Sequence, residues 1–198
     1  VMHEYFIGMD MLKQHVFKQV ELWGSGNLFN QLTITLDQLV LQAFEELNPG
    51  DAKCSINLNV ESVFTKSFQA FVDRGDDQVF SKIVFEFRQA NILQHYDEFA
   101  VASQLIKSKG GTVAVGATFP DTVGVVNLGR LNASMAKIFW RPGAEDVLPK
   151  FANEIAEIQK NGTVFVLARL DDEVGLNIGH ELGITMFQGF YVDDLLKT

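Results

Sequence analysis

The chain has 198 residues, of which 47% are hydrophobic and 21% charged, so it can bury one sizeable core and is expected to fold as a single domain. Sixteen Lys and Arg residues against 25 Asp and Glu residues give a net charge of −9, which argues against nucleic acid and against an anionic membrane surface as partners. Cys54 is the single cysteine, so no disulfide can form within the chain, and the cytoplasm is the expected location.

The sequence shows no sign of a membrane span or a secretion signal. No apolar run approaches the length of a span, and residues 1–5 lack the basic-then-apolar order of a signal peptide. We therefore expect no direct insertion into a membrane. Because the first residue is Val, we also expect the chain to have been cut from a longer protein.

The first thirty or so residues are the least regular part of the chain. Residues 9–20 have a helical pattern, and residues 23–30 read as a loop. A strong helix is predicted over 33–47, because apolar side chains recur on one face of it. Trp23, Leu28 and Phe29 would form a contact surface if they were exposed, and the alternative is that they fold back on the core.

From residue 45 onward one pattern occurs four times: an amphipathic helix, a glycine stop and a short β-rich apolar run. We expect acidic residues 171–173 to begin the last of the predicted helices. Alternating strands and helices without a Gly-rich phosphate loop favour an α/β fold of the (β/α) barrel type over a dinucleotide-binding sheet, although spacing alone leaves both open. The six predicted strands are 54–59, 82–87, 112–115, 135–140, 163–168 and 184–188, with helices that include 90–107 and 144–160.

In such a barrel the chemistry lies on the residues that end each strand at the C-terminal mouth. The strand-end residues are, in chain order, Asn57, Glu86, Gly116, Lys137, Arg169 and Gln188. This series resembles that of the EAL family, whose members hydrolyse cyclic di-GMP with two divalent cations held at the mouth of a TIM-like barrel.

Several motifs carry the resemblance. Residues 55–59 are similar to the family's V-N-L-S strand, with Asn57 at the metal-binding Asn. Residues 84–89 are similar to L-E-I-T-E, with Glu86 at the metal-binding Glu and Gln89 in place of the Glu that steadies a catalytic loop. Lys137 matches the lysine of L-K-I-D, and residues 186–191 resemble the closing Q-G-Y strand with Gln188.

The N-terminal match is weaker. Residues 3–8 resemble a degenerate E-A-L-L-R motif, which puts Glu4 at the signature Glu and Gly8 at a phosphate-binding Arg. Leu36 and Asp37 resemble the family's L-D-x-W helix. The family's first strand, with its Q-P pair, is not visible. We therefore expect one EAL-like domain over 1–198, in which 1–32 is atypical, 33–198 carries the clear resemblance, and the barrel is incomplete or modified at its N-terminal strands.

Other positions depart from the family at its metal site. The two aspartates of D-D-F-G fall on Gly116 and Ala117, the aspartate of L-K-I-D is Phe139, and a glutamate proposed to activate water is Arg169. Magnesium and manganese need several hard oxygen ligands, and a guanidinium can act neither as a ligand nor as a base. The resemblance therefore implies a degenerate site with no catalytic residues, no bound metal and no Mg or Mn cofactor.

Two interpretations of the remaining charges stay open. Glu86, Lys137 and Arg169 would form a structural ion cluster that Asn57 and Gln188 complete, or Lys137 and Arg169 would bind a phosphate of a cyclic dinucleotide. We expect a bacterial, non-catalytic signalling module that acts on a protein partner or an attached domain, with a homodimer left open. The alternatives are a cyclic di-GMP receptor without hydrolysis and, less favoured, a metal-dependent phosphodiesterase.

Overall fold

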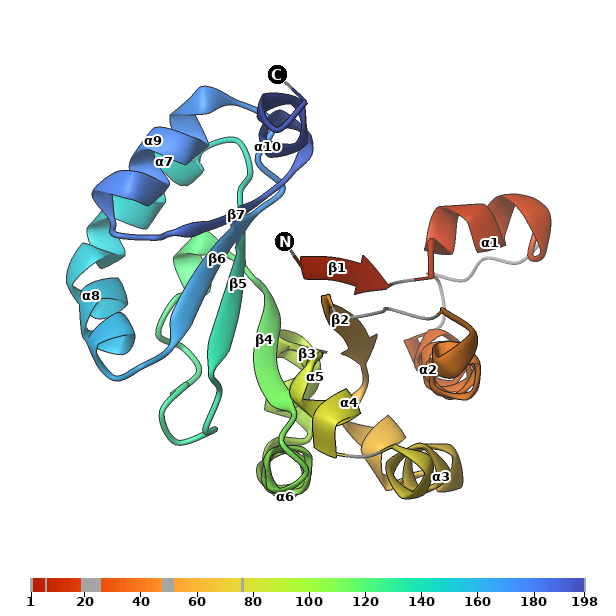
Figure 1. The fold of residues 1–198 in the computed structure, drawn as a ribbon. Coiled ribbons are helices and arrows are strands. Elements are labelled where there is room, and N and C mark those ends of the chain that lie inside the picture. The colour runs from red at the N-terminus through yellow and green to blue at the C-terminus, as the bar shows by residue number, and fades with distance from the viewer. Residues whose placement is uncertain (1, 6, 19–25, 48–51, 76, 198) are drawn as a thin grey trace.

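The computed structural model describes residues 2–5, 7–18, 26–47, 52–75 and 77–197, without the side chains of 45–47 and 77. Seven parallel strands form one sheet in which every strand pairs with its neighbours in chain order. The sheet curls into a half-barrel with β1 at one end and β7 at the other (Figure 1). The strands are β1 (Met2–Tyr5), β2 (Lys53–Leu58), β3 (Ile83–Arg88), β4 (Thr112–Thr118), β5 (Met135–Phe139), β6 (Val164–Ala168) and β7 (Met186–Gln188).

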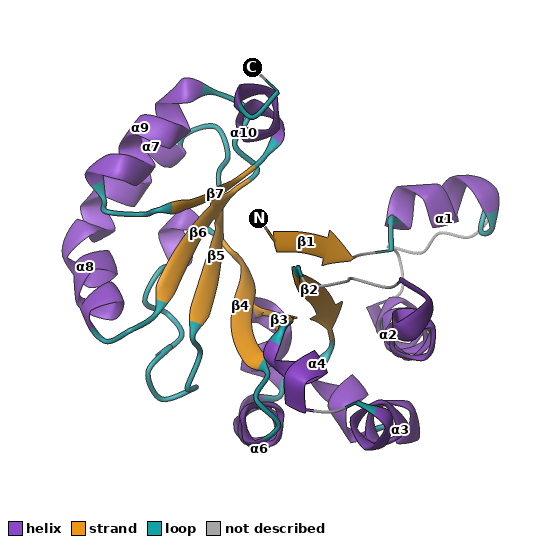
Figure 2. Cartoon of the chain, in the orientation of Figure 1, coloured by secondary structure: helices purple, strands orange, loops and turns teal. Residues whose placement is uncertain are grey.

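Helices lie along the outside of the curl (Figure 2). None of those in the described ranges has the length and apolarity needed to span a bilayer. The α-helices are α1 (Met9–His15), α2 (Gly26–Leu47), α3 (Lys66–Arg74), α4 (Asp77–Ser81), α5 (Gln89–Gln94), α6 (Tyr96–Ser108), α7 (Ala144–Val147), α8 (Ala152–Lys160), α9 (Glu173–Glu181) and α10 (Phe190–Leu195). Three short 3-10 segments are η1 (Val60–Phe64), η2 (Pro120–Thr122) and η3 (Leu148–Phe151).

The barrel-type α/β fold and all six predicted strands are confirmed. The structure adds β1, a seventh strand that the sequence pattern did not reveal because four residues are too few to show an alternation. The predicted start of the last helix is also confirmed, since the Asp172 side chain accepts a hydrogen bond of 2.9 Å from the N–H of Gly175.

Several predicted boundaries were wrong. The loop predicted over 23–30 is helical from Gly26 onward, and residues 19–25, which include Trp23, lie outside the described ranges. The predicted helix 90–107 is two helices, because the backbone leaves the helical region at His95 with φ −129° and ψ 48°. The predicted helix 144–160 is three short segments, with Pro149 in the middle one, where its missing N–H does not support a continuous helix.

Alternation along the strands separates an apolar face from a polar one. On β3, Phe85 and Phe87 are buried in the core shared with the helices, while Glu86 points to the other face. On β2, Ile56 joins the same core and Asn57 lies opposite Glu86 in the β2–β3 register. The concave face of the half-barrel therefore carries polar side chains from neighbouring strands, and these make up the candidate site.

Candidate functional site

Lys137 lies at the centre of a buried ion cluster on the concave face. Its Nζ atom is 2.6 Å from Oε2 of Glu86 and 3.3 Å from Oε2 of Glu4. The side chains of Lys137 and Glu86 are each only 4% exposed, against 22% for Glu4. Buried charges of this kind are stable only when they are paired, and here one ammonium is shared by two carboxylates from β1 and β3.

Glu4 connects the two ends of the sheet. Asn57 on β2 donates to its Oε1 atom at 3.2 Å, and Gln188 on β7 donates to its Oε2 atom at 2.6 Å. Both oxygens of Glu4 are therefore already bound by protein groups. The resemblance puts Glu4 at the site together with Asn57, Glu86, Lys137, Arg169 and Gln188, and the structure brings all of these except Arg169 into one cluster.

The two carboxyl groups respond to burial differently. Burial raises the pKa of Glu86 above its ordinary value, and Lys137 offsets only part of that effect. Burial also acts to raise the pKa of Glu4, but attraction to Lys137 and hydrogen bonds from Gln188 and Asn57 outweigh it, so that this pKa is lowered. The Ser55 hydroxyl, two residues before Asn57 on the same face of β2, makes a long 3.5 Å contact with Glu86.

Gly116 faces Glu86 at very close range. A Cβ atom added to Gly116 would lie 2.6 Å from Cγ and 2.7 Å from Cδ of Glu86, with Oε1 nearer still. The register of β4 against β5 is irregular between Val115 and Thr118, and Ala117 adopts a left-handed backbone with φ 52°. The side chain of Glu86 therefore fills the space that an aspartate at position 116 would need.

The loop after β4 is held by Gln89. Gln89 donates from Nε2 to the carbonyl oxygen of Thr122 at 3.1 Å and accepts from the Thr122 hydroxyl at 2.8 Å. A neutral amide thus connects the end of β3 to this loop. Gln89 therefore keeps the loop after β4 attached through Thr122.

Arg169 does not join the ion cluster. It is exposed, has a left-handed backbone with φ 63°, and its guanidinium carbon lies 3.9 Å from the centroid of the Phe139 ring. The Phe139 ring contacts that of Phe119 edge to face at 6.3 Å, and Arg141 lies over Phe119 at 4.9 Å. The prediction of one ion cluster containing Glu86, Lys137 and Arg169 is therefore wrong for Arg169. Its guanidinium makes a cation–π contact with Phe139 instead.

A second polar network beside the ion cluster was missed by the sequence reasoning. Asp37 on α2 is only 8% exposed, and its Oδ2 atom accepts from the N–H of Asn59 at 2.7 Å, from Nδ2 of Asn59 at 2.8 Å and from the Ser62 hydroxyl at 2.6 Å. Burial raises the pKa of Asp37 from 3.8 to about 6, despite these hydrogen bonds. A lone Asp inside an apolar helix face was the signal that could have revealed this network.

The same network borders a cavity among the described residues, with a volume of about 340 Å³. Arg88, at the end of β3, donates to Oδ1 of Asn59 at 3.1 Å and lines this cavity together with Arg169. Phe29, from the group singled out in the sequence, also lines it, whereas Leu28 is 49% exposed. The remaining lining residues are Tyr5, Ile7, Met9, Thr33, Leu36, Asp37, Val40, Asn57, Leu58 and Asn59.

The two carboxylates of the ion cluster, Glu4 and Glu86, both have protein partners. Among the described residues, no three His, Cys, Asp or Glu side chains are grouped so that they could hold a metal ion. Glu86 is bound to Lys137, both oxygens of Glu4 have protein partners, and Gly116 offers no side-chain ligand. A bridging ion would have to displace a buried ammonium, which is a costly exchange.

Solved structures with a similar fold include EAL domains. The EAL domain of Xanthomonas citri FimX in complex with c-diGMP matches with a TM-score of 0.66 and 10% identity, over 82% of this chain and 70% of that one. The fold is that of an EAL domain. The S helix-GGDEF-EAL region of Vibrio cholerae LapD bound to c-di-GMP matches with a TM-score of 0.64 and 17% identity, over 83% of this chain.

The Bacillus subtilis YkuI protein, in complex with substrate c-di-GMP and calcium, matches with a TM-score of 0.60 and 18% identity, over 80% of this chain. This chain spans 44% of the LapD chain and 42% of the YkuI chain, so it corresponds to less than half of those proteins. No protein-family description and no curated protein matches its sequence.

Proposed function

We propose that this chain is a non-catalytic, EAL-like signalling module that acts through contacts with a protein partner or an attached domain. The observation that carries the proposal is the commitment of Glu4 and Glu86 to Lys137, together with the close approach of Glu86 to Gly116. Two-metal hydrolysis of a phosphodiester needs both ions in place to generate the nucleophile and to stabilise the leaving oxygen. A face with no side-chain ligand at Gly116, and with Glu86 filling the space beside it, has fewer oxygen ligands than two ions require.

The direct test is an assay for cleavage of cyclic di-GMP to the linear dinucleotide by chromatography, with Mn²⁺ or Mg²⁺ and a blank without protein. We expect no turnover above the blank with either ion. Turnover that a Glu86→Gln variant abolishes would overturn the proposal and restore the phosphodiesterase interpretation. Turnover that survives in this variant would point to a contaminating enzyme instead, and the preparation would be repurified.

A second candidate function is a cyclic di-GMP receptor without hydrolysis. The fold is shared with EAL domains solved with this nucleotide, which favours the candidate, and two exposed arginines line the cavity beside α2. Against it, Lys137 is buried and already bound by two carboxylates, so it is not available to bind a phosphate. Isothermal titration with cyclic di-GMP, with and without Mg²⁺, separates the two. Micromolar binding would support a receptor, and no heat would leave protein contact as the function.

Exposed apolar side chains near the end of the described chain support a role in protein contact. Phe190, on α10, is 79% exposed, and Leu196, directly after α10, is 74% exposed. Isolated apolar side chains on a surface are common, but two large ones on one short helical segment favour a contact surface. Sedimentation of the purified chain tests the homodimer directly. Self-association through this surface would be lost in a Phe190→Ser, Leu196→Ser variant.

A further inference from the structure

A second, much smaller cavity lies beside the loop that follows β4. Its volume is about 10 Å³, and its polar lining comes from Gln89, Thr118 and Thr122. The rest of the lining is mostly apolar side chains of the same loop, together with Ala136 and Phe165. This volume is about the least that one water molecule needs, so the cavity has no room for an organic ligand.

The hydroxyl group of Thr118 is buried at this cavity without a partner among the described residues. Thr118 is 5% exposed, and its Oγ1 atom makes no hydrogen bond to any protein group in the described ranges. The residue lies at the end of β4, just where the register against β5 is irregular. Buried polar atoms nearly always have a hydrogen-bond partner, so this hydroxyl points to a bound polar molecule.

Gln89 brings an unused donor to the same cavity. Its amide nitrogen carries two N–H groups, and within the described residues that nitrogen donates only to the carbonyl oxygen of Thr122, at 3.1 Å. Gln89 is 6% exposed, so bulk solvent does not readily reach its second N–H group. Two buried side chains that line one small cavity therefore each have hydrogen-bonding capacity to spare.

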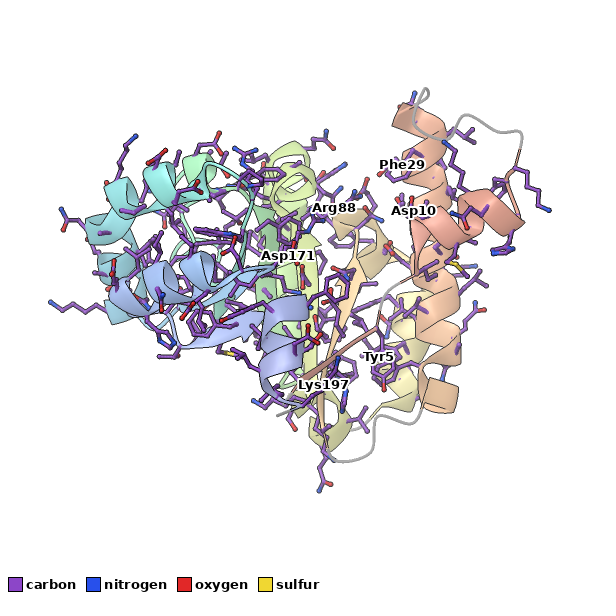
Figure 3. The ribbon with its side chains drawn as sticks, turned by 90° about the horizontal axis from the view of Figure 1, so that it is seen from above. Tyr5, Asp10, Phe29, Arg88, Asp171 and Lys197 are labelled. Carbon is purple, nitrogen blue, oxygen red and sulfur yellow. The ribbon has the colours of Figure 1, made fainter. Side chains whose placement is uncertain are left out.

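This small cavity is separate from the larger one beside α2. Arg88, the residue before Gln89, points toward α2, and its guanidinium carbon lies 6.0 Å from the centroid of the Phe29 ring (Figure 3). Gln89 instead faces the loop after β4. No residue of the ion cluster lines the small cavity, so its occupant depends neither on catalysis nor on a nucleotide.

We propose that the small cavity binds one internal water molecule, held by the Thr118 hydroxyl and the second N–H group of Gln89. A buried water typically makes about three hydrogen bonds, and Thr122 supplies the third partner. The Thr122 hydroxyl oxygen has two acceptor lone pairs, of which one is taken by the N–H of Phe119 at 3.0 Å. The water thus joins β4, α5 and η2, and it fixes the loop after β4.

The experiment counts the long-lived internal water molecules of the purified chain by oxygen-17 relaxation dispersion. Thr118→Val replaces the hydroxyl group with a methyl group of similar size, and we expect the count to fall by one. Thr163→Val is the matched control, because Thr163 is 6% exposed and its hydroxyl donates directly to the carbonyl oxygen of Ala133 at 3.1 Å. This control should keep the count of the unaltered chain.

The direction of the stability change is an independent test. If the Thr118 hydroxyl binds a water, Thr118→Val removes hydrogen bonds and should lower the midpoint of thermal unfolding by about 2 to 4 °C. If the hydroxyl is dry and unpaired, the same substitution removes an unfavourable buried polar group and raises the midpoint. Gln89→Met removes the second partner of the water and should also lower the count by one, and it decides if Thr118→Val does not fold.

Three results would overturn the proposal. The first is that the unaltered chain and Thr118→Val hold the same number of long-lived water molecules. The second is that Thr118→Val raises the unfolding midpoint. The third is that Thr163→Val lowers the count as much as Thr118→Val does, which would mean that the count follows general loosening of the core and not this cavity.

Discussion

Lys137 lies on β5 and Arg169 directly follows the next strand, β6, yet their environments are opposite. Lys137 is buried and bound by two carboxylates, whereas Arg169 is exposed and lies against an aromatic ring. A ligand that bound the first charge would have to replace a buried partner, which is costly. The second is available to solvent. The two positions show that a cation at a strand end becomes a candidate ligand-binding group only where no carboxylate neutralises it.

The largest expected effect comes from removing Lys137. A Lys137→Met variant leaves two carboxylates without their cation on a buried face, which should cost about 3 to 5 kcal/mol in the free energy of unfolding. Urea unfolding measures it. Lys197→Met is the matched control, because Lys197 forms a 2.9 Å pair with Asp194 in which both side chains are 73% exposed, and it should cost less than about 1 kcal/mol. Equal losses would contradict the central role of burial.

The titration of Asp37 gives the next largest effect. Because its pKa in the folded protein is about 6 rather than 3.8, the folded state binds this proton more tightly than the unfolded state does. The resulting stabilisation is fully present below about pH 4 and is lost as the pH rises through about 6, a change of about 3 kcal/mol. Asp37→Asn lacks this titration.

The measurement is the difference in unfolding free energy between the unaltered chain and Asp37→Asn, followed from pH 4 to pH 7. We expect the unaltered chain to lose stability relative to the variant across this interval and the difference to become constant above it. A difference that stays constant throughout would show that Asp37 is not buried as described.

A substitution at Gly116 tests how tightly Glu86 packs against β4. Gly116→Ala forces its new methyl group against the Glu86 side chain and should cost about 1 to 3 kcal/mol. Gly129→Ala is the matched control, since a Cβ at that position meets only an atom of Asn127 at 3.5 Å. The cost of Gly116→Ala should fall when Glu86 is shortened to Ser. An unchanged cost in that background would show that Glu86 is not the obstacle.

The smallest expected effect on stability comes from the exposed contact between Arg169 and Phe139. A double-mutant cycle of Arg169→Gln and Phe139→Leu should give a coupling energy of about 0.5 to 1 kcal/mol, the size of an exposed cation–π contact. Thermal unfolding of the four proteins measures it. A coupling energy of zero would mean that Arg169 is not held over the ring in solution.

Much of the fold could be predicted from the sequence because apolar runs after glycine-terminated helices define buried parallel strands. The strand-end residues could also be placed, since strands of one sheet present their C-terminal ends together. The pairing of charges could not, because it depends on distances of a few ångströms across the curl. Glu4, on β1, approaches Lys137 on β5, whereas Arg169 has a left-handed backbone and lies over Phe139.

The cavity lined by α2 and the strand ends could not be predicted from the sequence either. Phe29 comes from a segment predicted as a loop, and α2 in fact begins at Gly26, which places this side chain opposite the strand ends. Arg88 follows the strand predicted over 82–87, and its contact with Asn59 depends on the loop that follows β2. Long-range placement of this kind leaves no periodic signal in the sequence.

We propose that the carboxylates of the concave face pair with Lys137 and hold no metal ions. The most direct measurement is a titration of Mn²⁺ into the chain, with free Mn²⁺ followed by electron paramagnetic resonance. We predict that the free signal matches that of a protein-free solution at equal ion concentration. Depletion of about two equivalents of Mn²⁺ at micromolar concentration, abolished by Glu86→Gln, would contradict the claim.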